Sequence, residues 1–386
     1  MRLAILAPLA LLAVMLTNAA AGADAPANLV AVPAEAFVPD VAIDAKGVVH
    51  VVYATSEKNG YYIRSEDKGK TFSPRVKINE GTTVGFTMGE RGPKLALGAE
   101  GSIHVAWGEA WAPGVKTQAR YSRSVDGGKS FEKARGVSSN TGIDGVTIAA
   151  DDKNHVMVFW HVMEPKQEQV KQATWLWMSS SKDNGQSFGA SEQVKSNFGT
   201  LACSMCMMRA RVAADGEVLL AYRAAERSIR DFYVLKGKVG ANAFVATRVN
   251  EDNWELPTCP MCGPEMTLDA KGQAVVAFMS RHKVYWSAGD EKLAAFKGHA
   301  GTPGQYKNDS DEIYPSAAMN AKGEVLMVWQ NGPMSTTGKA SVKWATYRAD
   351  GTATGATGTL GTTTSGTKAT VAVGPDDGFY ILTTAK

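Results

Sequence analysis

One short pattern recurs seven times along the chain and constrains its fold more than any other feature. Each copy is an apolar strand, a polar turn that usually ends in glycine, and a second strand that ends near an aromatic residue. The copies occupy residues 39–53, 93–107, 146–160, 211–222, 264–278, 315–329 and, in a weaker form, 369–382. Their turns lie about 55 residues apart. A period near 50 residues with several short strands per unit is typical of β-propellers.

The composition agrees with such a fold. Glycine accounts for 39 of the 386 residues, which is above its usual share of ~7% and indicates many turns. Apolar residues make up 44% of the chain, enough for a large core. We predict an all-β protein with a single β-propeller of six or seven four-stranded blades over residues 24–386. A seventh blade would need residues 28–32 to pair beside the last, two-stranded copy.

The first residues resemble a processing segment rather than part of the fold. A positive start at Arg2 and an apolar run from Leu3 to Thr17 precede Ala21-Gly22-Ala23, which has the small residues of a cleavage site. The run is shorter than the ~20 residues that span a bilayer. We therefore predict a signal peptide at residues 1–23 and a secreted or periplasmic protein without a membrane span. The net charge of +3 gives no reason to expect a nucleic-acid partner.

A second motif, S-x-D-x-G-x-x-F, follows the pattern in the first three units, at residues 65–72, 124–131 and 181–188. Its acidic residues are Asp67, Asp126 and Asp183. An aspartate at this place in a hairpin can accept backbone N–H groups, and the following glycine can adopt a positive φ. We predict that the three aspartates are structural.

This motif resembles the Asp-box, or bacterial neuraminidase repeat, of the sialidase superfamily. The resemblance implies a propeller whose Asp-box turns join the third and fourth strands of a blade, on the face opposite the catalytic pocket. Sialidases open their first blade with an Arg-Ile-Pro phrase, whose arginine helps to bind the substrate carboxylate. Phe37-Val38-Pro39 stands at that place here. The sequence therefore predicts that sialidase activity is absent or weak.

Four cysteines form two C-x-x-C pairs in matching positions. Cys206 lies ten residues before Gly216, and Cys262 lies ten residues before Gly272, so both pairs occupy loops that enter the inner strands of adjacent blades. We expect Cys203, Cys206, Cys259 and Cys262 to form one cluster at the axial mouth. No histidine follows either pair, which argues against covalent haem.

Three interpretations of the cysteines remain open. Disulfides are favoured in an exported protein. Four converging thiolates would suit zinc or Cu(I), and Met205 and Met261 inside the two pairs would favour a soft metal. Thiol–disulfide exchange would need an activated thiolate, and nothing nearby resembles a thioredoxin context.

Further polar residues are expected at the same mouth, because they follow the second strands or begin the inner strands. The candidate ligand-binding residues are Arg91, Glu109, His161, Arg209, Arg223, Glu265, Arg281, His282 and Gln330. A propeller mouth is also polar simply because water fills it. No catalytic residue can be assigned.

Two classes of function follow from the sequence. The first is a secreted or periplasmic module that binds a small ligand, a glycan, a partner protein or a metal ion such as zinc or copper. The second is an exo-sialidase or a related glycoside hydrolase that acts on acidic sugars. Convergence of Arg91, Arg209 and Arg281 near a carboxylate pair would favour the hydrolase.

Overall fold

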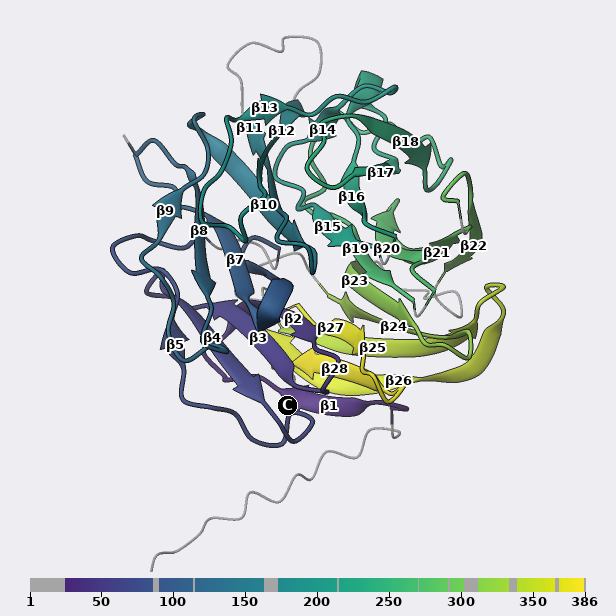
Figure 1. The fold of residues 1–386 in the computed structure, drawn as a ribbon. Coiled ribbons are helices and arrows are strands. Elements are labelled where there is room, and N and C mark those ends of the chain that lie inside the picture. Colours follow the sequence, from purple (N-terminus) through teal and green to yellow (C-terminus); the bar gives the residue numbers. More distant parts are fainter. Residues whose placement is uncertain are drawn as a thin grey trace, which may run out of the picture.

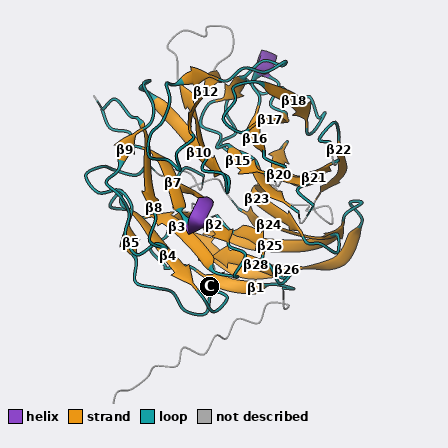
Figure 2. Cartoon of the chain, in the orientation of Figure 1, coloured by secondary structure: helices purple, strands orange, loops and turns teal. Residues whose placement is uncertain are grey.

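The computed structural model is a β-propeller of seven sheets arranged around a central axis (Figure 1). It describes residues 25–85, 90–113, 115–162, 173–213, 215–269, 271–290, 292–301, 312–332, 339–364 and 368–384. The predicted signal peptide, residues 1–23, lies outside these ranges. Strands dominate, and the described helices are the single turns η1 (Ala99–Gly101) and η2 (Glu226–Ser228) (Figure 2). In this part of the chain no helix has the length and apolar character needed to cross a membrane.

The first three blades follow one another along the chain. Blade 1 contains β2 (Phe37–Ile43), β3 (Val49–Ala54), β4 (Gly60–Ser65) and β5 (Val76–Lys77). Blade 2 contains β6 (Lys94–Leu97), β7 (Ile103–Gly108), β8 (Ala119–Ser124) and β9 (Arg135–Gly136). Blade 3 contains β10 (Ile143–Ala150), β11 (Val156–Val162), β12 (Ala173–Ser181), β13 (Glu192–Gln193) and an added strand, β14 (Leu201–Cys203).

The next three blades repeat the arrangement. Blade 4 contains β15 (Arg209–Val212), β16 (Glu217–Arg223), β17 (Phe232–Lys238) and β18 (Phe244–Arg248). Blade 5 contains β19 (Glu265–Leu268), β20 (Ala274–Ser280), β21 (Lys283–Gly289) and β22 (Phe296–Gly301). Blade 6 contains β23 (Glu312–Met319), β24 (Glu324–Asn331), β25 (Lys339–Arg348) and β26 (Ala353–Thr364).

The seventh blade is built from both ends of the chain. It contains β27 (Thr370–Val373) and β28 (Phe379–Thr383), and β1 (Asn28–Ala31) pairs with β28 in parallel. The first strand therefore joins the last sheet and closes the ring, which confirms the seven-bladed alternative. Among the described residues this blade has three strands, not the four of the general prediction.

The hydrophobic core lies between neighbouring blades. Trp107, at the end of the second strand of blade 2, is buried in a cluster with Tyr62 and Val52 of blade 1 and Leu95 of blade 2. Trp160 and Trp329 occupy equivalent buried places in later clusters. The aromatic residue that ends each repeat is thus explained by packing between sheets, because one sheet alone leaves both faces exposed.

The three S-x-D-x-G-x-x-F motifs form the turns that follow the third strands of blades 1 to 3. In the second, Asp126 Oδ1 accepts the N–H groups of Lys129 and Ser130 at 3.0 Å, and Asp126 Oδ2 accepts the Ser130 hydroxyl at 2.6 Å. Asp67 and Asp183 have equivalent partners. Gly128 has φ 83° and lies against Tyr62 of the preceding blade, so a Cβ there would clash. These contacts confirm the predicted turn geometry.

Asp126→Ala is expected to lower the free energy of unfolding by roughly 1–3 kcal/mol, because two backbone N–H groups and two hydroxyls lose their acceptor. Urea denaturation followed by tryptophan fluorescence measures the change. Asp126→Asn keeps one acceptor oxygen and serves as the matched control, with a smaller expected loss. If Asp126→Ala unfolded at the same urea concentration as the parent protein, these turns would contribute nothing to stability.

Candidate metal centre

The two cysteine loops enter neighbouring blades through the same backbone turn. Cys203 ends β14, which pairs with β12, and the chain then turns through Met205 into β15. Cys259 and Cys262 precede β19 in the corresponding way. Met205 and Met261, the third residues of the two pairs, have φ 64° and 47°, a left-handed conformation that few non-glycine residues adopt. The equal register seen in the sequence therefore reflects an equal local structure.

Three of the four thiols converge. Cys206 Sγ lies 3.4 Å from Cys259 Sγ and 3.6 Å from Cys203 Sγ. All three sulfur atoms lie within 4.8 Å of one another, and the side chains are buried. These separations far exceed the ~2.05 Å of a disulfide bond, and all four cysteines are free thiols in this structure. They are close to the ~3.8 Å between sulfur atoms that share one tetrahedral zinc ion.

Cys262 lies outside this group of three. Its Sγ accepts the N–H of Tyr314 at 3.4 Å, and its side chain packs in the core with Trp254 and Ile313. The shared cluster expected from the sequence thus contains Cys203, Cys206 and Cys259. Cys262 contributes its backbone instead, because its N–H donates to the sulfur of Cys206.

The surroundings of the three thiols favour one thiolate, at Cys206, which accepts hydrogen bonds from the other two thiols. Burial opposes ionisation of Cys206, but hydrogen bonds from Cys203 and Cys259, with the nearby charge of Arg223, hold its pKa well below the ordinary value. Burial raises the pKa of Cys203, and hydrogen bonding to Cys203 and Cys206 raises that of Cys259. A cation placed between the sulfur atoms would let all three ionise, as metal coordination requires.

Glu90 connects the two cysteine loops, a role that no pattern in the sequence indicates. Its buried carboxyl accepts the N–H of Met207, next to Cys206, at 3.2 Å, and also the N–H of Gly263, next to Cys262. A Cβ on Gly263 would collide with the backbone of Met207, so only glycine allows the loops to pack this closely. Burial, together with the nearby Cys206, raises the pKa of Glu90 to about 8.

The metal-free parent protein is expected to lose stability as the pH rises, and Glu90→Gln is expected to abolish this pH dependence. Between about pH 4.3, where an unfolded glutamate ionises, and pH 8, the folded protein holds a proton that the unfolded chain has released. Raising the pH through this window therefore favours unfolding, and glutamine does not titrate. Urea denaturation at several pH values measures the difference between the two proteins, and the exposed Glu66→Gln is the control. Parallel stability curves for parent and Glu90→Gln would contradict the expectation.

A cavity of about 500 Å³ opens beside the three converging thiols, with Met205 in its wall. Arg91 forms a bidentate ion pair with Asp144 there, at 2.5 Å for both contacts. Glu109 also lines the cavity and pairs with Arg120 at 2.9 Å. The ring of Trp111, which is 73% exposed, stands at the same cavity. Of the candidate ligand-binding residues, Arg91 and Glu109 are the pair that this cavity brings together.

Arg209 and Glu265 lie instead in a buried charge network on the propeller axis. Arg209 donates to Asp40 Oδ1 at 2.8 Å and to both oxygens of Glu265 at 2.7 and 2.9 Å. Lys368 Nζ reaches Glu265 at 2.5 Å. Burial opposes ionisation of Glu265, but the Arg209 and Lys368 charges outweigh it and hold its pKa well below the ordinary value.

Arg223 and His161 lie beside the cysteine loops, close to Cys206. Arg223 is buried and donates to the carbonyl oxygens of Cys262, Met279 and Arg230, so it supports the second cysteine loop. His161 is buried, with Nδ1 2.7 Å from the hydroxyl of Thr174.

Three candidates remain on blades 5 and 6. Arg281 and His282 form the exposed turn between β20 and β21, where Arg281 donates to the carbonyl oxygen of Asp252 at 3.0 Å. Gln330 is buried within β24. The arginines that would mark a sialidase pocket, Arg91, Arg209 and Arg281, therefore have three different environments.

Solved structures share the fold of this chain. An α-L-arabinanase of Penicillium chrysogenum complexed with arabinobiose is 11% identical, over 84% of this chain and 98% of its own, with a TM-score of 0.54. The GH93 α-L-arabinofuranosidase of Fusarium graminearum is 12% identical over 81% and 93%, with a TM-score of 0.53. A Hadza microbial sialidase aligns at 13% identity over 83% and 68%, with a TM-score of 0.47.

The first two alignments support a common propeller architecture, and at this identity they say nothing more. No protein-family model matches the sequence, and no curated protein matches it significantly.

Proposed function

We propose that this protein is an extracytoplasmic propeller that binds one soft metal ion, Cu(I), through Cys203, Cys206 and Cys259. The observation that carries the proposal is the convergence of three buried thiols from loops of two adjacent blades. Arg223 and the Cys262 N–H stabilise negative charge on Cys206, the central sulfur atom. Glu90 holds both loops in register without being part of the sulfur group.

The donor set favours Cu(I) over zinc. Structural zinc sites almost always have four ligands, and the three thiols are one short, with Cys262 committed to the core. The side chains of Met205 and Met261 pack against the same cluster. Thioether and thiolate sulfur are the donors that Cu(I) prefers.

The proposal places the protein outside the cytoplasm because of the predicted signal peptide at residues 1–23. Thiols in that environment are prone to oxidation. A bound metal ion would hold the three sulfur atoms apart and keep them from forming a disulfide. Metal binding and disulfide formation are therefore alternatives at this site.

The test is to load reduced protein with Cu(I) under anaerobic conditions, remove excess metal with a competing chelator, and measure copper and free thiols per chain. We expect one copper ion per chain, with all four thiols recovered after denaturation and chelation. Retention of zinc in preference to copper would overturn the choice of metal. Failure of the reduced protein to retain copper would overturn the proposal, and two free thiols per chain in protein isolated without reductant would show a disulfide instead.

A second function is favoured by the cavity beside the cysteines. The exposed ring of Trp111 could stack on the apolar face of a sugar, and the Arg91–Asp144 pair and Glu109 offer paired donors and acceptors for hydroxyl groups. We propose a small glycan as the ligand there. Both arginine–carboxylate pairs are already neutralised, so the cavity suits a neutral sugar better than a sialic acid.

Glycan binding is tested by titrating the protein with arabinobiose, as a neutral probe, and with a sialoside. We expect arabinobiose to bind more tightly than the sialoside, and Trp111→Ala to abolish binding while leaving copper stoichiometry unchanged. Turnover of a fluorogenic sialoside that is lost in Arg91→Ala would instead support the hydrolase alternative.

A further inference from the structure

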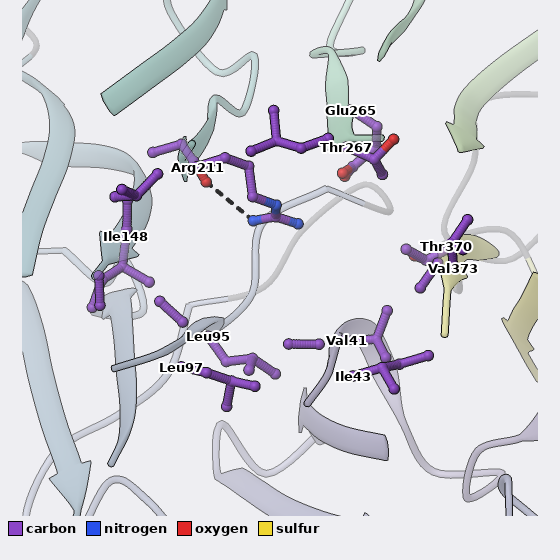
Figure 3. Close-up of a pocket in the computed structure, with 18 of the residues that line it drawn as sticks. Val41, Ile43, Leu95, Leu97, Ile148, Arg211, Glu265, Thr267, Thr370 and Val373 are labelled. Carbon is purple, nitrogen blue, oxygen red and sulfur yellow. Dashed lines mark hydrogen bonds between the residues drawn. The ribbon is translucent and has the colours of Figure 1, made fainter. Parts of the chain in front are cut away.

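A second cavity lies at the other end of the inner strands from the cysteine loops. The cysteines precede the inner strands β15 and β19, whereas this cavity, of about 360 Å³, is lined largely by later residues of those strands and their counterparts. Figure 3 shows its wall, in which aliphatic side chains from several blades surround one guanidinium group, and the carboxylate of Glu265 and the side chains of Thr267 and Thr370 complete the lining. The aliphatic residues labelled there are Val41, Ile43, Leu95, Leu97, Ile148 and Val373.

The guanidinium belongs to Arg211. Its Nη1 donates to the carbonyl oxygen of Ala210 at 3.1 Å, which is the dashed contact in Figure 3. No carboxylate pairs with it among the residues that the structure describes. The nearest acidic groups, Asp40 and Glu265, are already bound to Arg209.

The charges around the axis do not balance. Arg209, Arg211, Lys94 and Lys368 act on one another and on two carboxylates, Asp40 and Glu265. Glu90 also lies near Lys368, but it binds the backbone of the two cysteine loops and does not line this cavity. At neutral pH this leaves two more positive than negative charges in the described part of the network.

Both excess cations are held in an unfavourable setting. Lys94 is 3% exposed, and within the described residues its ammonium has neither an ion pair nor a hydrogen bond. Burial, with repulsion from Arg209, lowers the pKa of Lys94 to about 8 and that of Arg211 to about 10. Of these two cations, the half-buried Arg211 lines the cavity. A cation shielded from water without a partner is costly, so an anion from solution would be stabilising beside it.

We propose that this cavity binds a small organic carboxylate, with its charged end on Arg211 and its apolar part against the aliphatic wall. A guanidinium can donate two parallel hydrogen bonds to a carboxylate. The surrounding aliphatic side chains disfavour a strongly hydrated inorganic ion, which would lose water without new partners. This proposal is independent of the metal centre, which lies at the opposite end of the inner strands.

Isothermal titration at constant ionic strength tests the proposal, with hexanoate as the probe and sulfate and hexan-1-ol as comparisons. We expect saturable binding of hexanoate that is at least about tenfold weaker in Arg211→Gln and unchanged in Arg75→Gln, a surface arginine control. The alcohol, which lacks the charge, should not bind. Cys206→Ser should bind hexanoate like the parent protein, which separates this site from the metal centre.

Equal hexanoate binding by the parent protein and Arg211→Gln would overturn the proposal. Sulfate binding as tight as that of hexanoate would also overturn it, because the cavity would then only neutralise charge. Arg211→Gln is expected to fold, since the substitution removes a cation that Arg209 repels. Its thermal unfolding without ligand checks this directly.

Discussion

Cys206→Ser is expected to weaken Cu(I) binding by more than about 100-fold. Cys206 is the central sulfur atom, within 3.6 Å of both other thiols, so its loss leaves two thiols without their shared neighbour. Even the loss of a group that only supports a metal ligand typically costs 10–100-fold in affinity, and the loss of a ligand should cost more. Competition against a chromogenic Cu(I) chelator measures the change.

Cys262→Ser is the matched control, because it alters a cysteine of the same loop that lies outside the group of three. We expect its copper affinity to stay within about tenfold of the parent protein. Equal losses in Cys206→Ser and Cys262→Ser would mean that the metal recruits all four thiols. Unchanged affinity in Cys206→Ser would contradict the three-thiolate centre.

Arg209→Met is expected to lower the free energy of unfolding by about 3–5 kcal/mol. Arg209 is 1% exposed and forms ion pairs with Asp40 and Glu265, so its removal leaves two buried carboxylates undercompensated. In this variant Lys368 still pairs with Glu265, and the Leu95 N–H still donates to Asp40. Each carboxylate therefore keeps one partner. Urea denaturation at pH 7 measures the change.

Arg75→Met provides the comparison, since Arg75 forms an exposed ion pair with Glu35 at 3.3 Å. Its removal should change stability by less than about 1 kcal/mol. If Arg209→Met does not fold, the milder Arg209→Lys should still be less stable than the parent protein, because an ammonium cannot reproduce the bidentate contact. Similar stabilities for the Arg209 and Arg75 variants would contradict the role given to the axial network.

The propeller could be predicted from the sequence because the residues that recur in each repeat have a definite structural role. Gly47 and its equivalents mark the turns between first and second strands, and Trp107 and its equivalents mark buried contacts between blades. The closure by β1 was a weaker prediction. Residues 28–31 have no repeat equivalent, and only their pairing with β28 identifies them as part of the seventh blade.

The cysteine site could be predicted in part. Equal register correctly brought Cys206 and Cys259 together, because adjacent blades place equivalent loops side by side. Register could not reveal which way each side chain points, and Cys262 turns into the core beside Tyr314. Glu90 was missed because, apart from Glu312 ahead of blade 6, the equivalent places in the other repeats carry no acidic residue that would draw attention to it.

The charged residues expected at the mouth show another limit of prediction from sequence, because their partners lie on other blades. Arg209 and Glu265 share a register with Asp40 and Lys94, which the sequence reveals, but it does not show that opposite charges meet across the axis. Arg91 likewise meets its partner Asp144 only when blades 2 and 3 pack together. Pairs formed between blades depend on the closed ring and not on local sequence.

X-ray absorption spectroscopy at the copper edge of the Cu(I)-loaded protein tests the metal centre most directly. We predict a copper ion with three sulfur neighbours at thiolate distance, and the same spectrum for Cys262→Ser. Because Cys203, Cys206 and Cys259 are buried and within 4.8 Å of one another, no rearrangement of the loops is needed for this coordination. A spectrum dominated by nitrogen or oxygen neighbours, or one that changes in Cys262→Ser, would contradict it.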